Sequence, residues 1–235
     1  MGILKEIFAR PVYFGDILGD ILLEEQKQED EEEEEYQNEE GQKHVSHDQS
    51  THGRGGGGRR QSYSKRHKQW RESLSEDELK AIDSYTEIGY EAIKNCQNDK
   101  RDCSKLIKKD IRNLKSALDR APKYEGETYR GLNFGIEERD QFVASVVANG
   151  GMVDKGFLST SHHVKVATRF ATEGEEDTNS VAGVLLTIQN KSGVDISKLS
   201  SHTEEAEVVI LPGAKLRLLN VFKYKKLVVL HLEEE

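Results

Sequence analysis

Phe157-Leu158-Ser159-Thr160-Ser161 lies between Tyr129-Arg130-Gly131 and Glu204-Glu205-Ala206-Glu207, and this ordered set of three stretches decides the fold. About one or two supersecondary units separate each stretch from the next. The set holds an arginine beside a glycine, a run of hydroxyls on a strand, and glutamates before another strand. Guanidinium groups bind phosphate, and carboxylates accept hydrogen bonds from hydroxyls. The set therefore predicts a site for an anionic ligand that contains a sugar.

Charge divides the 235-residue chain into two unequal parts. Residues 1–53 carry 15 acidic and four basic side chains, whereas residues 54–235 carry 28 acidic and 30 basic ones. The net charge of -9 thus belongs to an N-terminal arm and does not indicate a substrate. The length allows one or two domains.

The N-terminal arm has an apolar start. Residues 1–23 contain Gly15-Asp16-Ile17-Leu18, repeated at once as Gly19-Asp20-Ile21-Leu22. We expect a docking or packaging segment that binds the chain's own folded domain, another protein or a virion shell. Ordinary local structure is the alternative.

Residues 24–69 read as a linker. Eleven Asp or Glu within residues 24–40 repel one another, which predicts a largely disordered acidic spacer. Mimicry of nucleic acid or cover for a basic site is the alternative. The Gly/Arg-rich continuation favours a flexible tether over nucleic-acid binding. Its histidines lack metal-ligand spacing, so no metal is expected.

Two further features bear on the compartment. Cys96 and Cys103 would lie about 10 Å apart on one continuous helix, too far to bridge, so free thiols are expected; a turn at Asn98-Asp99 would bring them closer. No stretch is long and apolar enough for a membrane span, and no secretory signal is visible. Glu6 argues against N-myristoylation.

A folded domain is predicted from Trp70 to Glu235. It opens with two helices. One has a capping box at Ser75 and Glu78, and the other runs from Ser104 to Arg120. Their expected core positions are Leu79, Ile82, Tyr85, Tyr90 and Ile93 in the first, and Leu106, Ile107, Ile111, Leu114 and Leu118 in the second.

The second half is richer in strands. A strand over 126–131 is expected to run into a glycine turn, and further strands are predicted over 156–161, 184–188, 207–211, 215–221 and 227–232. Helices are predicted over 137–149 and 164–171, a polar loop over 173–180 and a turn at Pro212-Gly213. Helices first and many strands later indicate an α+β domain.

The polar residues of this half suit chemistry at a sugar. Ser159 and Ser161 would share one face of a strand, as would Glu205 and Glu207, about 6–7 Å apart. Two carboxylates so placed raise each other's pKa. One can stabilise an oxocarbenium-like sugar, and the other can deprotonate a nucleophile. Polar residues at the start of a strand are the simpler interpretation.

These motifs together resemble the R-S-E class of mono-ADP-ribosyltransferases, which includes clostridial-type exoenzyme toxins and related bacteriophage enzymes. The resemblance covers about two-thirds of the chain, from Trp70 to Glu235. It implies an ADP-ribosyltransferase-like split β-sheet core with N-terminal helices, and NAD as substrate in a central cleft. Tyr129, Thr160, Ser161 and Phe170 would join the NAD site.

The resemblance also implies individual roles. Arg130 would bind the NAD phosphates, and the backbone of Gly131 would contact the nicotinamide amide. Ser159 would position Glu207, which would hold the ribose and stabilise the oxocarbenium ion. Glu205 would receive the target, and a Glu-x-Glu pair implies that the target is arginine. The loop from Ser197 to Glu204 would be the target-recognition turn.

Three functions follow as hypotheses. The first is ADP-ribose transfer to protein arginines, with self-modification at Arg54, Arg59 or Arg60. The second is NAD glycohydrolysis, in which water replaces the protein. The third is an interaction protein on a catalytically silent fold. Action in the cytoplasm of a host or target cell is expected, after delivery by a phage particle or a secretion system.

Overall fold

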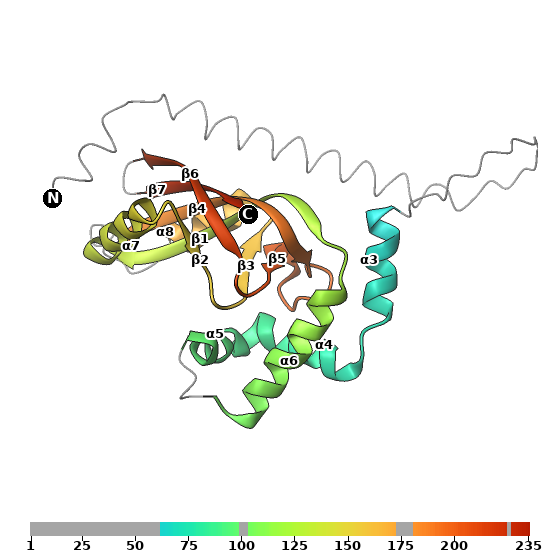
Figure 1. Cartoon of the computed structure of the whole chain (residues 1–235). Coiled ribbons are helices and arrows are strands. Elements are labelled where there is room, and N and C mark those ends of the chain that lie inside the picture. The colour runs from blue at the N-terminus through green and yellow to red at the C-terminus, as the bar shows by residue number, and fades with distance from the viewer. Residues whose placement is uncertain (1–61, 99–102, 173–180, 225–226) are drawn as a thin grey trace, which may run out of the picture.

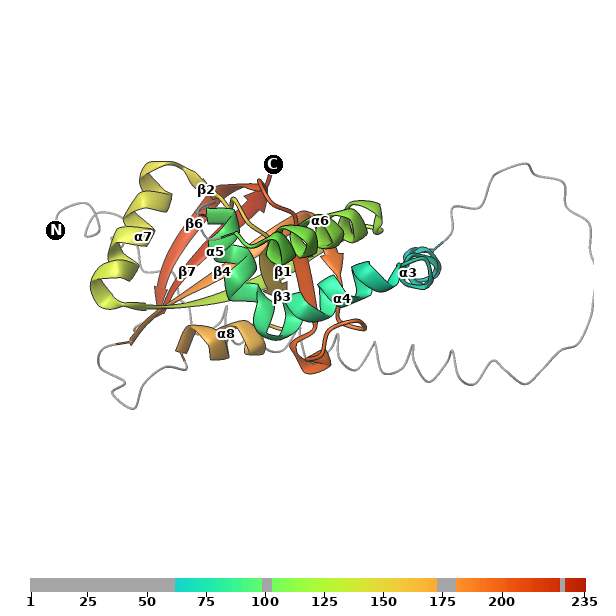
Figure 2. The same cartoon turned by 90° about the horizontal axis from the view of Figure 1, so that it is seen from below.

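The computed structural model describes residues 62–98, 103–172, 181–224 and 227–235. The docking segment 1–23, the linker up to Gln61 and the polar loop 173–180 lie outside the described residues. Figures 1 and 2 show the β-strands beside a group of helices, α4, α5 and α6, which lies over the end of the sheet where β3 and β5 run.

The helical part begins earlier than the sequence predicts. Its elements are α3 (Tyr63–Glu72), α4 (Glu76–Ser84), a π-helical turn η1 (Tyr85–Gly89), α5 (Tyr90–Asn98) and α6 (Lys105–Arg120). Ser62 caps α3, so helical structure is present from Tyr63, seven residues before Trp70. The predicted capping box of Ser75 and Glu78 is confirmed at the start of α4.

Two expected core positions of these helices are wrong. Leu106 is 74% exposed and Leu79 is 40% exposed, although Leu114 and Leu118 are fully buried. Positions 107, 111, 114 and 118 form one stripe at helical spacing, and Leu106 lies about 100° away from it, because each residue turns the helix by that angle. The buried stripe packs with Trp70, Ile82, Tyr85, Ile93, Phe157 and Val209 in the first core cluster.

The expectation of two free thiols is also wrong. Cys96 and Cys103 form a disulfide with a Cα–Cα distance of 5.0 Å. One continuous helix would hold the two cysteines about 10 Å apart, but α5 ends at Asn98 and α6 starts at Lys105. The two cysteines thus belong to separate segments that the disulfide joins. The alternative of a turn at Asn98-Asp99 includes Asp99, which lies outside the described residues.

A seven-stranded sheet forms the second half. Its strands are β1 (Tyr124–Gly135), β2 (Gly151–Val153), β3 (Leu158–Ser161), β4 (Val181–Asp195), β5 (Glu207–Ile210), β6 (Lys215–Tyr224) and β7 (Leu227–Glu234). The order is β1-β3-β5-β4-β7-β6-β2, and β1 also pairs with β4 along its length. β1 meets β3 only at Tyr129 and Ser161, so the sheet divides there.

β1 differs from the expected strand that ends in a glycine turn. It continues through Gly131 to Gly135, so Arg130 lies within the strand and not at its end. A Cβ on Gly131 would stand 1.8 Å from the carbonyl oxygen of Ala167. Glycine is therefore required because the backbone of α8 (Val164–Thr172) packs directly on β1.

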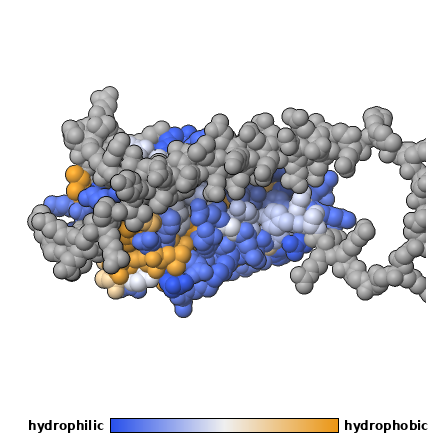
Figure 3. Space-filling view, turned by 90° about the horizontal axis from the view of Figure 1, so that it is seen from above, coloured by the Kyte–Doolittle hydropathy of each residue, from blue (hydrophilic) through white to orange (hydrophobic). Residues whose placement is uncertain are grey.

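Two helices cover opposite faces of the larger part of the sheet. α7 (Ile136–Ala148) contributes Val143 and Val146 to a core with Val184 and Leu186, whereas α8 contributes Ala167 and Ala171 to a core with the intervening Leu185. Figure 3 shows apolar side chains gathered at the end of the molecule that carries the β6–β7 hairpin, and hydrophilic ones over the middle. The β3–β5 part is left facing the α4–α6 helices, and the site lies between them.

Candidate active site

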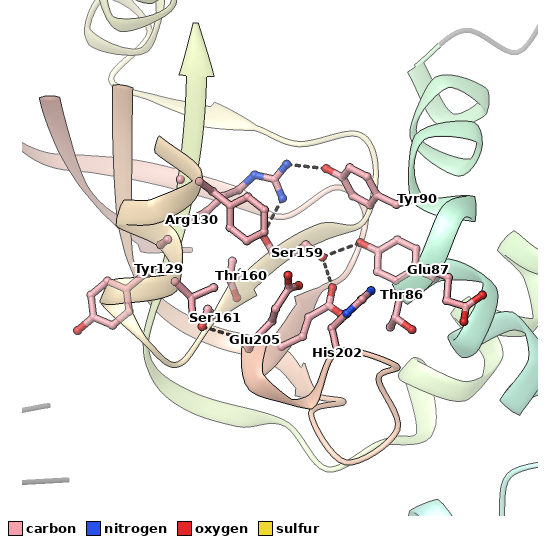
Figure 4. Close-up of a pocket in the computed structure, with 16 residues that line it drawn as sticks. Thr86, Glu87, Tyr90, Tyr129, Arg130, Ser159, Thr160, Ser161, His202 and Glu205 are labelled. Carbon is pink, nitrogen blue, oxygen red and sulfur yellow. Dashed lines mark hydrogen bonds between the residues drawn. The ribbon is translucent and has the colours of Figure 1, made fainter. Parts of the chain in front are cut away.

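A cavity of about 340 Å³ opens where β1, β3 and the start of β5 meet η1, α5 and α8. Figure 4 shows side chains from these elements converging on it. Every site residue expected from the sequence lines the cavity: Tyr129, Arg130, Gly131, Ser159, Thr160, Ser161, Phe170, Glu205 and Glu207. The fold therefore brings the three motifs together.

Arg130 is held by two contacts. Its Nη1 donates to the backbone oxygen of Ser159 at 2.6 Å, and its Nη2 donates to the hydroxyl of Tyr90 at 2.5 Å (Figure 4). Burial would raise the pKa of Tyr90, but the charge of Arg130 and its hydrogen bond lower it overall. The guanidinium is thus fixed at the cavity wall, where one planar, permanently charged group can meet an anion.

Glu207 is the buried carboxylate of the cavity. It is 7% exposed, and the Ser159 hydroxyl donates a short hydrogen bond to its Oε1. The Tyr85 hydroxyl lies 3.3 Å from the same Ser159 oxygen. A chain from the π-helical turn through β3 to β5 therefore fixes the orientation of this carboxylate.

Burial raises the pKa of Glu207 to about 7. The hydrogen bond from Ser159 acts in the opposite direction, whereas the negative charge of Glu205 raises the pKa further. A carboxyl group with this pKa changes its charge near neutral pH, which is common at catalytic sites.

Glu205 and Glu207 were expected on one face of the same strand, and this prediction is wrong. Glu205 ends a 3₁₀ turn (Thr203–Glu205), and Ala206 then adopts a left-handed conformation with φ of 45°. The Ser161 hydroxyl donates to the backbone oxygen of Glu205 at 2.7 Å. The turn brings both carboxylates to the cavity, but Glu205 remains at the partly exposed mouth.

Glu204 lies away from the cavity lining. Its side chain is 68% exposed and stands 3.5 Å from Nδ1 of His202. Of the three acids in this stretch, only Glu205 and Glu207 line the cavity. This resolves which two acids of the stretch face the site.

Sequence reasoning missed several lining residues. Tyr85 and Tyr90 are expected as core, yet both hydroxyls bond to site residues, and Thr86, Glu87 and His202 also line the cavity. A tyrosine on an otherwise apolar stripe carries a polar tip, which is the available signal. The π-helical turn that bears Tyr85 and Thr86 is a feature found frequently at functional sites.

Comparison with known proteins identifies the class. The family model for ADP-ribosyltransferase exoenzyme matches residues 61–229. The chain belongs to this family. The expected ADP-ribosyltransferase-like α+β fold is confirmed as well by the similar solved structures.

Individual relatives make the likeness more specific. The putative NAD(+)–arginine ADP-ribosyltransferase Vis of Vibrio splendidus is 33% identical over 112 residues, which are 47% of this chain and 43% of that protein. The crystal structure of Vis in complex with agmatine superposes with a TM-score of 0.53 at 22% identity, covering 75% of this chain and 87% of that chain.

Exoenzyme S from Pseudomonas aeruginosa, bound to Carba-NAD, gives a TM-score of 0.55 at 21% identity over 72% of this chain and 82% of that chain. The chain spans less than half the length of the curated relatives that it matches.

Two features are absent from the part of the chain that the structure describes. No group of three or more His, Cys, Asp or Glu in the described part of the chain could hold a metal ion. Within residues 62–98, 103–172, 181–224 and 227–235, no helix is long and apolar enough to cross a membrane.

Proposed function

We propose that the protein transfers ADP-ribose from NAD to arginine side chains of target proteins and releases nicotinamide. One observation carries the proposal. Glu207, a buried carboxylate fixed by Ser159, shares a cavity with Arg130 and with the more exposed carboxylate of Glu205. This arrangement supplies a cation for the pyrophosphate, one carboxylate for the reacting ribose and a second for the acceptor.

The NAD side of the cavity has the groups that the dinucleotide needs. Arg130 presents a guanidinium for phosphate oxygens, and Tyr129 and Phe170 offer aromatic surface at the cavity wall. Ser161 and Thr160 hold β3 in place, since their hydroxyls donate to backbone oxygens of Glu205 and Val208. We assign NAD to this side, with the Gly131 backbone beside the nicotinamide.

The reaction assigns different roles to the two acids. The bond between nicotinamide nitrogen and ribose C1′ breaks, and nicotinamide leaves with the electron pair. Ionised Glu207 stabilises the positive charge that develops on the ribose. A guanidinium nitrogen of the target then bonds to C1′, and Glu205 takes the proton that this nitrogen loses.

The acceptor side can hold a guanidinium. Nη2 of Arg169, on α8, lies 3.8 Å from Oε1 of Glu205, and this guanidinium stacks over Phe170 at 5.3 Å. A carboxylate that pairs with an internal arginine has the position and exposure to pair with an external one. Agmatine, the ligand of the related Vis structure, carries the same guanidinium group. These facts support arginine as the acceptor.

NAD glycohydrolysis is the second candidate. Glu205 is partly exposed at the cavity mouth, so water can reach the same position as a guanidinium. The two functions differ in where the ADP-ribose of NAD ends.

The test uses NAD labelled in its ADP-ribose part, with agmatine as acceptor, and measures nicotinamide release and labelled agmatine. We expect wild type to give both. Glu207→Gln should lose both, by a factor of about 10² to 10³, because the charge at the ribose is gone. Glu205→Gln should keep nicotinamide release but lose transfer by about 10² or more. Nicotinamide release without labelled agmatine would favour NAD glycohydrolysis. No nicotinamide release would leave only the hypothesis of a catalytically silent interaction protein.

The remaining parts of the chain extend this proposal. We assign catalysis to residues 70–235 together with α3. Residues 24 to 61 would form a linker, and residues 1–23 would serve docking or packaging in a phage particle or secretion system. Arg54, Arg59 and Arg60 are candidate self-modification sites, and all three lie outside the described residues. Mass spectrometry after incubation with NAD tests self-modification. A reporter fused to residues 1–53 that associates with no particle or partner would refute docking.

A further inference from the structure

The loop that carries Glu205 is anchored at its base by strand contacts. This acceptor loop, residues 196–206, connects β4 to β5. The amide of Ile196 donates to the oxygen of Glu207 at 2.9 Å, and the amide of His162 donates to the oxygen of Ala206 at 3.0 Å. Asp195, just before the loop, accepts from the Ser197 amide at 2.9 Å. Burial would raise the pKa of Asp195, but its bonds to His162 and Ser197 lower it below the ordinary value.

The tip of the loop is attached to a different part of the molecule. The Ser201 hydroxyl donates to Oδ1 of Asp83 at 2.9 Å, with Oε1 of Glu87 at 3.4 Å. The Ser201 amide donates to the hydroxyl of Thr86 at 3.3 Å, and that hydroxyl donates to the backbone oxygen of Asp83 at 3.1 Å. The tip is thus bound to the end of α4 and to η1.

The same short segment reaches the other half of the cavity. Tyr85, which lies between Asp83 and Thr86 in the chain, contacts Ser159, and Tyr90 contacts Arg130. Residues 83–90 therefore contact the NAD side through Tyr85 and Tyr90, and they contact Ser201 of the acceptor loop through Asp83 and Thr86. The π-helical turn widens the helix at this point, so neighbouring side chains serve both sides.

We propose that Asp83 and Ser201 are positioning residues for the acceptor, which hold the loop so that Glu205 faces the incoming guanidinium. The inference rests on the proposed function and adds residues that act through Glu205 without lining the cavity. Ser201 and Asp83 are both exposed, so these hydrogen bonds are individually weak and the loop tip can detach at modest cost. Attachment favours transfer to a guanidinium, whereas water needs no positioned loop.

The experiment compares Ser201→Ala and Asp83→Ala with wild type, with agmatine as the acceptor. We expect the ratio of labelled agmatine to NAD hydrolysed to fall by a factor of about 3 to 10, as for loss of one hydrogen bond. The KM for agmatine should rise, while the KM for NAD and the rate of hydrolysis without acceptor stay within about twofold. Ser201→Thr, which keeps the hydroxyl, should restore the ratio.

Controls separate positioning from a general loss of structure. Asp77→Ala changes the same helix, where Asp77 pairs with Lys109 at 3.0 Å, and should leave the ratio at the wild-type value. An unchanged ratio in both test variants would overturn the proposal, as would an equal fall of transfer and hydrolysis. Failure of the wild type to release nicotinamide would overturn the proposed function itself, which is a distinguishable result.

Discussion

The two halves of the cavity are built differently. On the NAD side, hydrogen bonds join Arg130, Ser159 and Glu207 to one another and to the buried Tyr85 and the partly buried Tyr90. On the acceptor side, Glu205 lies in a loop whose tip is held by exposed side chains. We therefore expect the NAD side to keep one geometry and the loop of the acceptor side to change its position more easily.

This difference fits the chemistry of the two proposed substrates. NAD is the same molecule in every reaction and its reacting bond must meet a carboxylate in one orientation, which favours a rigid, buried site. A target protein brings its own surface, so the acceptor side benefits from exposure and from contacts that are easily exchanged. Mutations on the NAD side should therefore have large effects on both reactions, and mutations on the acceptor side should have smaller effects on transfer alone.

After substitution of the two acids, the largest effect is expected from Arg130→Lys. The guanidinium donates to the Ser159 oxygen and the Tyr90 hydroxyl at once, and a lysine ammonium cannot reproduce this planar fork. The kcat/KM for NAD should fall about a hundredfold, with hydrolysis and transfer falling together, since each charged hydrogen bond contributes about 1.5–3 kcal/mol. Tyr90→Phe removes one partner only and should cost less. A change confined to transfer would contradict the division of the cavity.

The second prediction concerns stability. The pKa of Glu207 is raised to about 7, so burial disfavours its charged form in the folded state. This cost is absent below pH 4.5, grows as the pH rises to about 7 and is constant above it. Glu207→Gln should therefore increase the free energy of unfolding by about 2–3 kcal/mol at pH 8 and by little at pH 4.5, measured by urea denaturation.

Glu78 provides the matched control with the opposite sign. Its pKa is lowered to about 2: burial alone would raise it, but bonds from Ser75, Arg120 and Ser116 outweigh burial. The stability that it contributes is present above pH 4.5 and is lost as the pH falls towards 2. Glu78→Gln should destabilise the fold at pH 7 by about 1–3 kcal/mol. If both variants destabilised the protein at pH 8, the burial of ionised Glu207 would not lower the stability of the fold, and this prediction would be wrong.

The third prediction uses pH to observe the NAD side directly. If ionised Glu207 is the active form, kcat/KM for NAD hydrolysis should fall about tenfold per pH unit below about 7. Ser159→Ala should move the midpoint to higher pH, because the hydrogen bond that lowers the pKa is lost. Glu205→Gln should move it to lower pH, because the like charge that raises the pKa is lost. Shifts in the same direction would refute this electrostatic account.

Much of this site can be predicted from the sequence, because it depends on patterns among residues that are close together in the chain. Arg130 and Ser159 lie on strands whose alternation fixes their facing side, and turns such as Pro212-Gly213 have a recognisable chemistry. The helices over 136–148 and 164–172 and the four later strands lie where the pattern predicts them. The resemblance of three ordered motifs then supplies the arrangement of these elements.

The parts that the sequence does not reveal depend on contacts between distant segments. The capped helix that starts at Tyr63 lies in a stretch that reads as a linker, and tertiary packing of Trp70 and His67 decides its structure. The left-handed Ala206 breaks the alternation that would place Glu205 and Glu207 on one strand. Neither feature has a strong local signal. For Ala206 the reason is that non-glycine residues rarely adopt positive φ, so an alanine does not predict this conformation.

The smallest effect is expected from Arg169, and it tests the adjustable half. Its guanidinium stands 3.8 Å from Glu205, in a pair where both side chains are partly exposed. An acceptor arginine must share or replace this contact, which contributes at most about 1 kcal/mol. Arg169→Gln should therefore lower the KM for agmatine about two- to fivefold, and the difference should shrink at high salt.

Arg169→Lys keeps the charge and should retain most of the competition with the acceptor. NAD hydrolysis without acceptor should be similar in all three proteins, because Arg169 does not line the cavity. A higher KM for agmatine in Arg169→Gln would mean that Arg169 helps to bind the acceptor, for example by orienting Glu205. Either sign changes transfer by a small factor and leaves hydrolysis alone, as expected if the contacts on the acceptor side involve partly exposed side chains.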